Sequence, residues 1–248
     1  MKDNILIYKD NRIIEASYRL SLVQQRLILL AISQINSVEV LNNNKIFIIT
    51  ASQYSSVFGI GKDAAFREMK KAIDELYKAS VKVIVEKGSV YDFRWISSKA
   101  TVIANQSVEI RFTADIAPFL SNLKGSFTKY KFLNITGMSS VFSIRIYEWM
   151  MQWKIKKSVT VSIEQLKERL QIADKYPAFA NLKQKVIDVA VTEINEMSDI
   201  NLSYELIKIG KKVVSVQFTF EFKERKNADI EIKQSIKDIL NDIKKGLK

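Results

Sequence analysis

Apolar and polar residues recur along this chain with two periods, one typical of helices and one typical of strands. Apolar positions three or four residues apart predict an amphipathic helix, and alternation at every second residue predicts a half-buried strand. The helical spacing is found at residues 21–36, 51–58, 63–79, 139–154, 163–171 and 178–198, with a short helix near 115–123. Strands are predicted at residues 45–50, 81–86, 90–96, 99–104, 107–113, 158–162, 201–209 and 212–222. This mixture predicts an α+β fold.

The predicted elements follow the same order twice. A helix, a strand, two helices and a hairpin begin near residue 21 and again near residue 139. The last helix before each hairpin has an apolar stripe with the spacing of one buried face. The stripes correspond position by position: Phe66, Met69, Ile73 and Leu76 match Phe179, Leu182, Val186 and Val189. Such agreement in order and spacing indicates an internal duplication.

Each half of the repeat has the order of a winged-helix domain. Two helices joined by a tight turn and followed by a hairpin are typical of this fold, in which the second helix enters the DNA major groove. We therefore predict two tandem winged-helix domains related by duplication. Gly125 and Gly137 lie in a polar stretch at 124–138, which indicates the boundary. The predicted units are residues 1–130, residues 131–222 and a charged tail at residues 223–248.

The residue types that are missing exclude several classes of enzyme. The 248 residues include no Cys and no His, so the chain has no disulfide, no thiolate zinc site and no imidazole base. A rolling-circle nickase is excluded because it needs a His-rich metal site beside its Tyr. The run Gly59-Ile60-Gly61-Lys62 has the wrong spacing for a phosphate-binding loop. We find no acidic cluster for carboxylate-metal chemistry, and we expect no metal, no cofactor and no catalytic activity.

The charge balance favours a polyanionic partner. Lys and Arg total 39 against 27 Asp and Glu, which gives a net charge of +12 and a pI near 9.6. A surplus of this size suits nucleic acid or an anionic membrane surface. No apolar run approaches the ~20 residues of a membrane span, and the first residues lack the apolar core of a signal peptide. We therefore expect a cytoplasmic protein without a membrane partner.

The polar faces of the two repeated helices supply the candidate DNA contacts. Burying the stripe of helix 63–79 turns several basic side chains outward. The first wing is predicted as the hairpin of strands 81–86 and 90–96, the second as that of strands 201–209 and 212–222, and both tips have lysines that suit phosphate contact. The predicted phosphate contacts are Lys62, Arg67, Lys70, Lys71, Lys87, Lys211 and Lys212. Helix 178–198 turns amides outward that can bind adenine edges and lysines that can reach guanine or phosphate. The predicted base contacts are Asn181, Lys183, Gln184 and Lys185.

Ordinary solvated surface is the alternative for each of these faces, and the motif context favours DNA contact most in helix 178–198. The chain also has three Trp that could stack on bases, namely Trp95, Trp149 and Trp153. Each lies in an apolar stretch. We therefore expect these three side chains to pack in the core or at an interface.

Several segments together resemble a known family. They are Arg19-Leu20-Ser21-Leu22-Val23-Gln24-Gln25-Arg26, Ser143-Ile144-Arg145-Ile146-Tyr147-Glu148 and the stretch from Phe179 to Glu205 with Glu193-Ile194-Asn195 and Ser198-Asp199. In this order they resemble the initiators of iteron-carrying plasmids, the RepE, RepA and Pi type. The resemblance covers roughly residues 5–222.

The resemblance implies a protein that initiates plasmid replication by binding DNA. Monomers would bind direct repeats at the origin, and dimers would bind an inverted repeat at the promoter of their own gene and repress it. The resemblance also implies contacts with the host initiator and the replicative helicase. The second domain would bind the repeat, and the first would supply phosphate contacts in the monomer and the dimer contact otherwise. Family members often place Arg in the second recognition helix, whereas this chain has Lys, which lacks a planar guanidinium.

Three other functions stay open from the sequence alone. A winged-helix transcriptional repressor would share the same DNA-binding chemistry and differ only in its partners. A carboxylate-metal nuclease is disfavoured by the lack of an acidic constellation. A membrane-surface protein would explain the charge, but the strand-rich pattern speaks against it.

Overall fold

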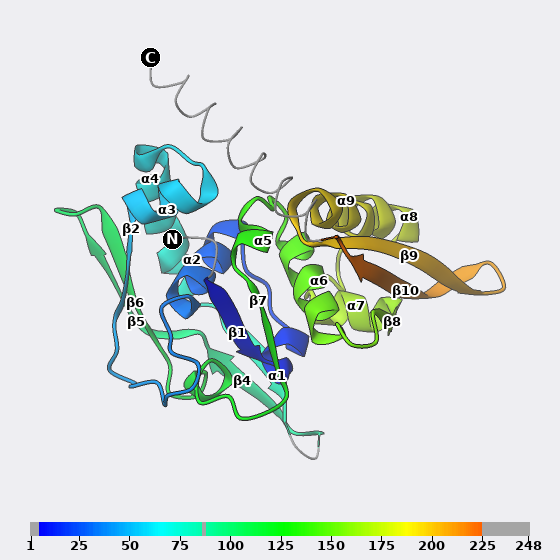
Figure 1. Ribbon diagram of the computed structural model, residues 1–248, viewed down its shortest axis with the longest axis horizontal. Coiled ribbons are helices and arrows are strands. Elements are labelled where there is room, and N and C mark those ends of the chain that lie inside the picture. Colours follow the sequence, from blue (N-terminus) through cyan, green and yellow to red (C-terminus); the bar gives the residue numbers. More distant parts are fainter. Residues whose placement is uncertain (1–4, 86–87, 225–248) are drawn as a thin grey trace.

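Two winged-helix domains lie at opposite ends of the long axis of the molecule (Figure 1). The computed structural model describes residues 5–85 and 88–224. The first domain contains α2 (Leu22–Ile32), β2 (Phe47–Thr50), α3 (Ala51–Phe58), α4 (Lys62–Leu76), β3 (Ser80–Ile84), β4 (Val90–Arg94), β5 (Ile96–Val102) and β6 (Ser107–Phe112). The second contains α6 (Val141–Gln152), β8 (Ser158–Ser162), α7 (Ile163–Arg169), α8 (Phe179–Leu182), the π-helical turn η3 (Lys183–Ile187), α9 (Asp188–Met197), β9 (Ile200–Ile209) and β10 (Lys212–Phe222).

The helices begin where the sequence provides a cap. The hydroxyl groups of Ser21 and Ser162 each accept a hydrogen bond from the third backbone N–H of the following helix. In both cases the Gln at that third position accepts a second hydrogen bond, from the backbone N–H of the Ser. The Thr50 hydroxyl likewise accepts a hydrogen bond from the third backbone N–H of α3, but no side chain among the described residues bonds to the backbone N–H of Thr50 there. Because these side chains satisfy N–H groups that have no partner inside the helix, they fix where each helix starts.

The two domains have the same sheet topology, as the predicted duplication requires. The strand order is β2-β6-β5 in the first domain and β8-β10-β9 in the second. In both sheets the strand that precedes the helix pair forms antiparallel hydrogen bonds with the second strand of the hairpin, as in Phe47↔Ile110 and Val161↔Val216. The wing of the first domain is therefore β5–β6, and the wing of the second is β9–β10.

The prediction that strands 81–86 and 90–96 form the first wing is wrong. These residues give β3 and β4, which pair with each other in a separate two-stranded sheet inserted between α4 and the wing. Each pair of strands is adjacent in the sequence and joined by a short connection, so chain order does not distinguish the two hairpins. The wing is the hairpin whose second strand pairs with β2. That pairing joins residues about sixty positions apart in the chain.

The remaining elements connect the domains, and apart from η2 the sequence analysis did not predict them. They are β1 (Leu6–Asp10), α1 (Asn11–Glu15), the 3-10 turn η2 (Ala117–Phe119), β7 (Phe127–Lys131) and α5 (Leu133–Thr136). The helix expected near 115–123 is limited to η2. The stretch at 124–138 contains β7, which pairs antiparallel with β1, and α5. The domain boundary near residue 130 stays a prediction, and the tail from residue 225 lies outside the described residues.

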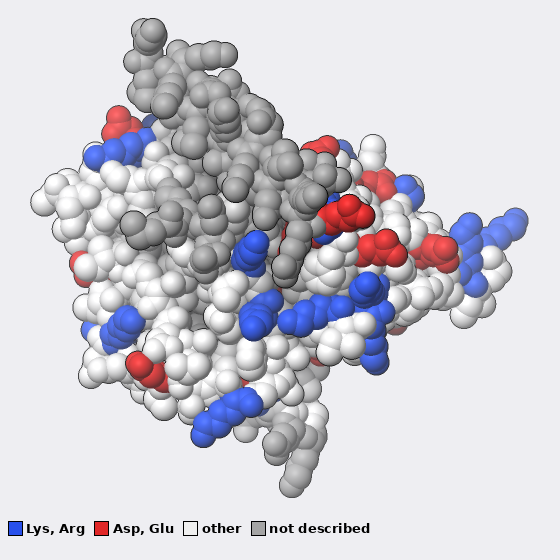
Figure 2. Space-filling model, viewed as in Figure 1, with Lys and Arg blue, Asp and Glu red and all other residues white. Residues whose placement is uncertain are grey.

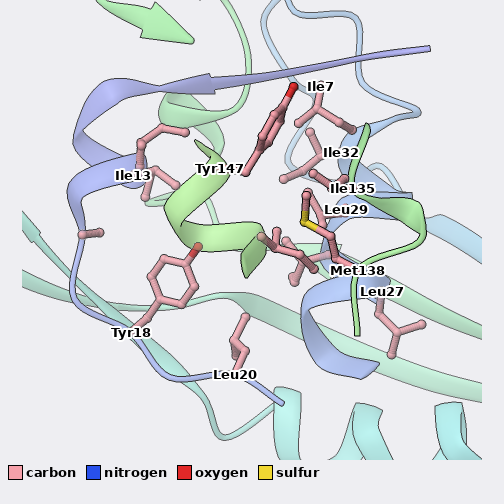
Figure 3. Close-up of a cluster of buried hydrophobic side chains, with 14 of the residues drawn as sticks. Ile7, Ile13, Tyr18, Leu20, Leu27, Leu29, Ile32, Ile135, Met138 and Tyr147 are labelled. Carbon is pink, nitrogen blue, oxygen red and sulfur yellow. The ribbon is translucent and has the colours of Figure 1, made fainter. Parts of the chain in front are cut away.

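Helix α6 is buried nearly all round, as its apolar sequence predicts. Residues 143–151 are all buried. Figure 3 shows Tyr147 of α6 in one cluster with Ile7 of β1, Ile13 of α1 and several side chains of α2. Trp149 is also buried, as is Trp95, while Trp153 is half-buried beneath Lys156. The core of the first domain thus continues onto the first helix of the second.

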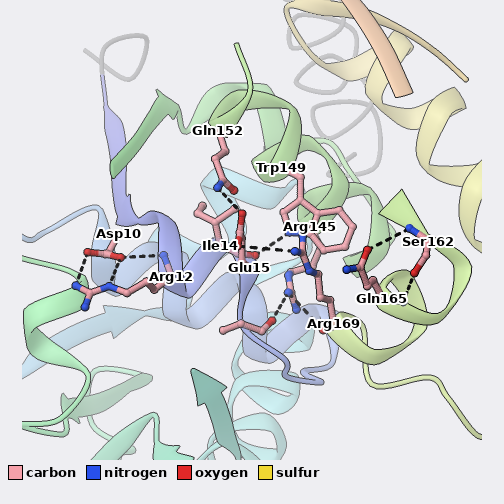
Figure 4. A network of polar contacts seen from close by, with 11 residues as sticks. Asp10, Arg12, Ile14, Glu15, Arg145, Trp149, Gln152, Ser162, Gln165 and Arg169 are labelled. Atoms are coloured by element: carbon pink, nitrogen blue, oxygen red, sulfur yellow. Dashed lines mark hydrogen bonds and ion pairs between the residues drawn. The ribbon is translucent and has the colours of Figure 1, made fainter. Parts of the chain in front are cut away.

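Polar contacts fix the N-terminal segment on α6 (Figure 4). The Arg145 guanidinium donates to the carbonyl oxygens of Ala16 at 2.7 Å and Tyr18 at 3.2 Å, and it lies 3.6 Å from the centroid of the Tyr18 ring. The Trp149 indole N–H donates to the carbonyl oxygen of Ile14 at 2.8 Å. Because both side chains are buried and donate to backbone carbonyls of the first domain, they limit how far the domains can move relative to each other.

Candidate nucleic-acid interface

The first recognition helix, α4, buries the predicted stripe and exposes the predicted basic residues. A left-handed Gly59 ends α3, so that only a short turn separates the two helices. Phe66, Met69, Ile73 and Leu76 are buried. The basic side chains that the sequence analysis selected on this helix are all exposed: Lys62, Arg67, Lys70 and Lys71. The ammonium group of Lys70 lies 5.0 Å from the centroid of the Phe66 ring, which holds it beside the start of the helix.

Two of the four acidic residues of α4, Asp74 and Glu75, are paired near its C-terminal end, while Asp63 and Glu68 lie in its N-terminal half. Asp74 forms an ion pair with Lys99 on β5, and Glu75 pairs with Lys78 at 3.4 Å. No ion pair of this kind involves the four selected basic residues within the described part of the chain. The exposed face of α4 therefore carries four basic side chains that can contact phosphates, alongside Asp63 and Glu68.

The second recognition helix is interrupted by the π-helical turn η3. The turn adds one residue to a helical repeat, so the buried face moves by one position after Val186. Ala190 is buried where the repeat predicts Val189, and Val189 itself is half-buried. Asn181, Gln184 and Lys185 remain exposed, as predicted.

Lys183, one of the predicted base contacts, forms an ion pair within the protein. Its ammonium group donates to both carboxylate oxygens of Asp188, at 3.1 and 2.9 Å, and lies 5.8 Å from the centroid of the Tyr204 ring. The Tyr204 hydroxyl donates to Asp188 at 2.6 Å. These three side chains connect the recognition helix to β9, the first strand of the wing.

This arrangement keeps the pair ionised. The hydrogen bond to Asp188 raises the pKa of Lys183. Partial burial opposes ionisation of Asp188, but the hydrogen bonds from Tyr204 and Lys183 outweigh it and lower the pKa of the carboxyl group. Lys183 can therefore reach a base only by leaving an ionised partner at neutral pH.

The second wing projects away from the domain (Figure 1). Gly210 has φ of 59°, a left-handed conformation that suits glycine at a hairpin turn. Lys211 and Lys212 follow it and are exposed, as predicted. Figure 2 shows Lys and Arg gathered at this tip. Lys87, the remaining predicted phosphate contact, lies outside the described residues, and the hairpin that contains it is the inserted β3–β4 rather than the first wing.

Other basic residues on the surface were missed by the sequence analysis. Figure 2 shows a band of Lys and Arg across the middle of the face in view. Exposed lysines outside the predicted set include Lys129 and Lys131 of β7 and Lys154, Lys156 and Lys157 between α6 and β8. The run Lys154-Ile155-Lys156-Lys157 could have revealed the last group, whereas the lysines of β7 gave no signal because that strand was not predicted.

The described residues contain neither a metal-binding cluster nor a membrane-spanning helix. In residues 5–85 and 88–224, no group of three or more acidic side chains is placed to hold a metal ion. Across the same residues, no helix has the length and apolar character to cross a membrane.

Comparisons with known proteins identify related sequences. A family model described as "Initiator Replication protein, WH1" matches residues 6–151, and one described as "Initiator Rep protein, WH2" matches residues 162–220. A "Replication initiation protein" from Escherichia coli is 23% identical over 227 residues, which cover 88% of this chain and 70% of that protein. The "PI protein" from Escherichia coli is 22% identical over 237 residues, covering 82% of this chain and 78% of that protein.

A solved structure shares the fold of this chain over most of the length of both proteins. The crystal structure of Pi initiator protein in complex with iteron DNA matches with a TM-score of 0.77 at 22% identity. The match covers 90% of this chain and 100% of that chain. The pairing of two winged-helix domains is therefore common to both proteins.

Proposed function

This chain belongs to the family of initiator replication proteins, and on that premise we propose that it initiates plasmid replication by binding direct repeats of duplex DNA at an origin. The observation that supports the proposal most strongly is the pair of recognition helices, with exposed basic side chains on α4 and exposed amide and basic side chains on α8–α9. The related Pi initiator was solved with iteron DNA. The chain would act by binding in the cytoplasm, without catalysis and without a cofactor.

In this proposal the second domain contacts bases. Asn181, Gln184 and Lys185 are exposed in the first turns of the second recognition helix, the part that meets base edges in a helix-turn-helix complex. Amide side chains bind adenine with two hydrogen bonds, and Lys binds guanine. Lys183 contributes a base contact only if it exchanges Asp188 for DNA, so we assign it the smallest share.

The first domain and the second wing would contact the DNA backbone. Lys62, Arg67, Lys70 and Lys71 lie on the exposed face of α4, and Lys211 and Lys212 lie at the tip of β9–β10. Phosphate contacts fix the register of a protein on the duplex but carry no base information. Two linked domains on one chain can occupy a direct repeat without a second copy.

We expect the double variant Lys70→Ala/Lys71→Ala to bind every duplex more weakly and with less dependence on salt. Each phosphate contact contributes about −0.9 to the slope of log affinity against log salt. The slope should therefore become shallower by roughly 0.9 for each phosphate group that the variant no longer neutralises. Lys78→Ala is the matched control, because Lys78 lies just beyond the same helix and pairs with Glu75. A double variant with an unchanged slope would contradict the backbone role of α4.

We further propose that a homodimer exchanges with the DNA-binding monomer and that β4 provides the dimer contact. One edge of the β3–β4 hairpin is occupied, because β3 bonds to Ser17 through the bridge Ser17↔Lys82. The other edge, β4, pairs with no further strand among the described residues. It exposes Val90 by 61% and Tyr91 by 50%. An open apolar edge favours pairing with a second copy about a two-fold axis, and a two-fold dimer suits an inverted repeat at the promoter.

Val90→Lys should shift this exchange toward the monomer, because two copies would bring like charges together on the paired strands. Light scattering over a dilution series measures the fraction of dimer. Ile155→Lys is the matched control, since Ile155 is 91% exposed on a different part of the surface. An equal dimer fraction in the two variants would show that β4 is not the contact.

A transcriptional repressor without an initiator role is the second candidate. It would use the same recognition helices and the same dimer, so DNA binding alone does not distinguish it. Contacts with the host initiator and the replicative helicase belong only to the initiator.

Footprinting of one repeat tests the tandem DNA binding that both candidates share. One bound chain should protect two successive major grooves, and protection of one groove only would contradict tandem binding.

A further inference from the structure

The solvent-facing side of β9 changes character along the strand. Alternate residues from Asn201 through Ser203 to Glu205 are polar and exposed, as expected for a half-buried sheet. The next two positions on the same face are Ile207 and Ile209, which are 40% and 73% exposed. Among the described residues neither packs against the core. The exposed face of β9 therefore becomes apolar at two positions that do not contribute to the core.

The two isoleucines belong to the projecting part of the second wing, where lysines surround them. Ile209 lies directly opposite Lys212 in the hairpin register, and Lys208 lies opposite Val213 on the other face. Lys211 stands at the turn beside Gly210. The tip thus has an exposed apolar side chain with lysines on both faces of the hairpin.

The tip of the first wing also has an exposed apolar side chain, although its turn at residues 103–106 contains no Lys or Arg. Ile103 follows β5 directly and is 66% exposed at the turn into β6. Strand propensity alone does not explain these choices, because Thr fits a strand without exposing an apolar surface. An exposed apolar side chain at the tip of both wings points to a contact made outside the chain.

We propose that Ile209, with Ile207 behind it, enters the minor groove next to the bases contacted by α8–α9 and unstacks a base step there. Lys208, Lys211 and Lys212 would bind the phosphates that border the groove. Isoleucine is one of the residues that architectural proteins insert between base pairs, and the neighbouring positive charge fits a polyanion. This inference rests on the proposed function, since it assumes that the second domain binds duplex DNA.

Insertion gives the wing a role beyond clamping phosphates. Opening a base step costs least at flexible pyrimidine–purine steps, so the wing would favour such a step at a position where no side chain forms hydrogen bonds with bases. It would also bend the duplex away from the inserted side chain. A protein that starts replication would thus distort the DNA at each repeat on which it is bound.

A fluorescent base analogue tests the insertion directly. The probe is a duplex selected from a random library by the wild-type protein, with 2-aminopurine placed in turn at each position beside the segment that α8–α9 protects. We expect the wild-type protein to raise the fluorescence at one step. Ile209→Ala should abolish the rise and lower the affinity about tenfold, because it removes the buried apolar surface. Ile155→Ala, the control from another exposed site, should change neither.

The variant Ile209→Lys distinguishes insertion of an apolar side chain from simple binding of phosphates by positive charge. If the wing only clamps phosphates, this variant should bind more tightly, with a steeper salt dependence and the fluorescence of the wild type, and the inference would be overturned. Insertion predicts loss of the fluorescence rise instead. Wild-type protein that selects a sequence but raises no fluorescence overturns the insertion and leaves the proposed function standing. Failure to select any sequence overturns the proposed function itself.

Discussion

Replacing Lys9 by Met should lower the free energy of unfolding by about 3–5 kcal/mol, the usual cost of leaving one member of a buried ion pair alone. Lys9 and Glu148 are both fully buried, with 2.6 Å between the ammonium nitrogen and a carboxylate oxygen. The Tyr130 hydroxyl donates to the same oxygen at 2.5 Å. Without Lys9, the carboxylate of Glu148 would keep one neutral donor in a site that water does not reach.

Urea unfolding of the full chain measures this effect, and two further variants define its cause. Lys78→Met removes a pair whose side chains are 70% and 60% exposed, and it should change stability by less than about 1 kcal/mol. Adding Glu148→Gln to Lys9→Met removes the stranded charge, so the double variant should be more stable than Lys9→Met alone. A loss in Lys9→Met no larger than in Lys78→Met would mean that the buried pair does not hold β1 on α6.

Substituting Asn181, Gln184 and Lys185 together by Ala should reduce binding to the selected duplex to the level of a scrambled one. A good base contact discriminates by about 1–3 kcal/mol, so three together give a loss on the order of 10³-fold. The fold should persist, because all three side chains are exposed. Paired titrations of the selected and scrambled duplexes measure the ratio of affinities.

The matched control for this triple variant lies on the first recognition helix. Substituting Lys62, Arg67 and Lys71 together by Ala should weaken both duplexes alike, because phosphate contacts do not depend on sequence. Equal weakening of the two duplexes by the α8–α9 variant would show that the second domain does not contact bases. A loss of discrimination in the α4 variant alone would assign base contact to the first domain.

Local periodicity was enough to predict most of the fold. The helical stripes on α4 and α8–α9 mark the buried faces, and Thr50, Ser21 and Ser162 mark helix starts, because both signals act within a few residues. The exposed candidate residues of both recognition helices follow from the same stripes. Duplicated element order then predicts two domains of one kind.

What the sequence did not predict depends on contacts between distant residues. Strand β1 was missed because Lys9 interrupts its apolar pattern, and the partner that allows its burial, Glu148, is 139 positions away. The first wing was misassigned because β2 selects its partner across the sheet. Lys183 was expected on the outward face because the apolar stripe is buried on the other side. A pair with Asp188 was not expected, since residues five apart do not face each other on an α-helix. The π-helical turn between Lys183 and Asp188 brings the two together.

The most direct test of the central claim is replication of a plasmid that carries only an origin. The DNA flanking the gene for this chain, where the proposal places the direct repeats, is cloned on a plasmid that has no other replicator, and the chain is supplied from a second plasmid. We predict that the origin plasmid persists with the wild-type chain and is lost with the Asn181, Gln184 and Lys185 triple variant. Loss of the origin plasmid with the wild-type chain, while that chain binds the repeats, would contradict the initiator role and favour the repressor.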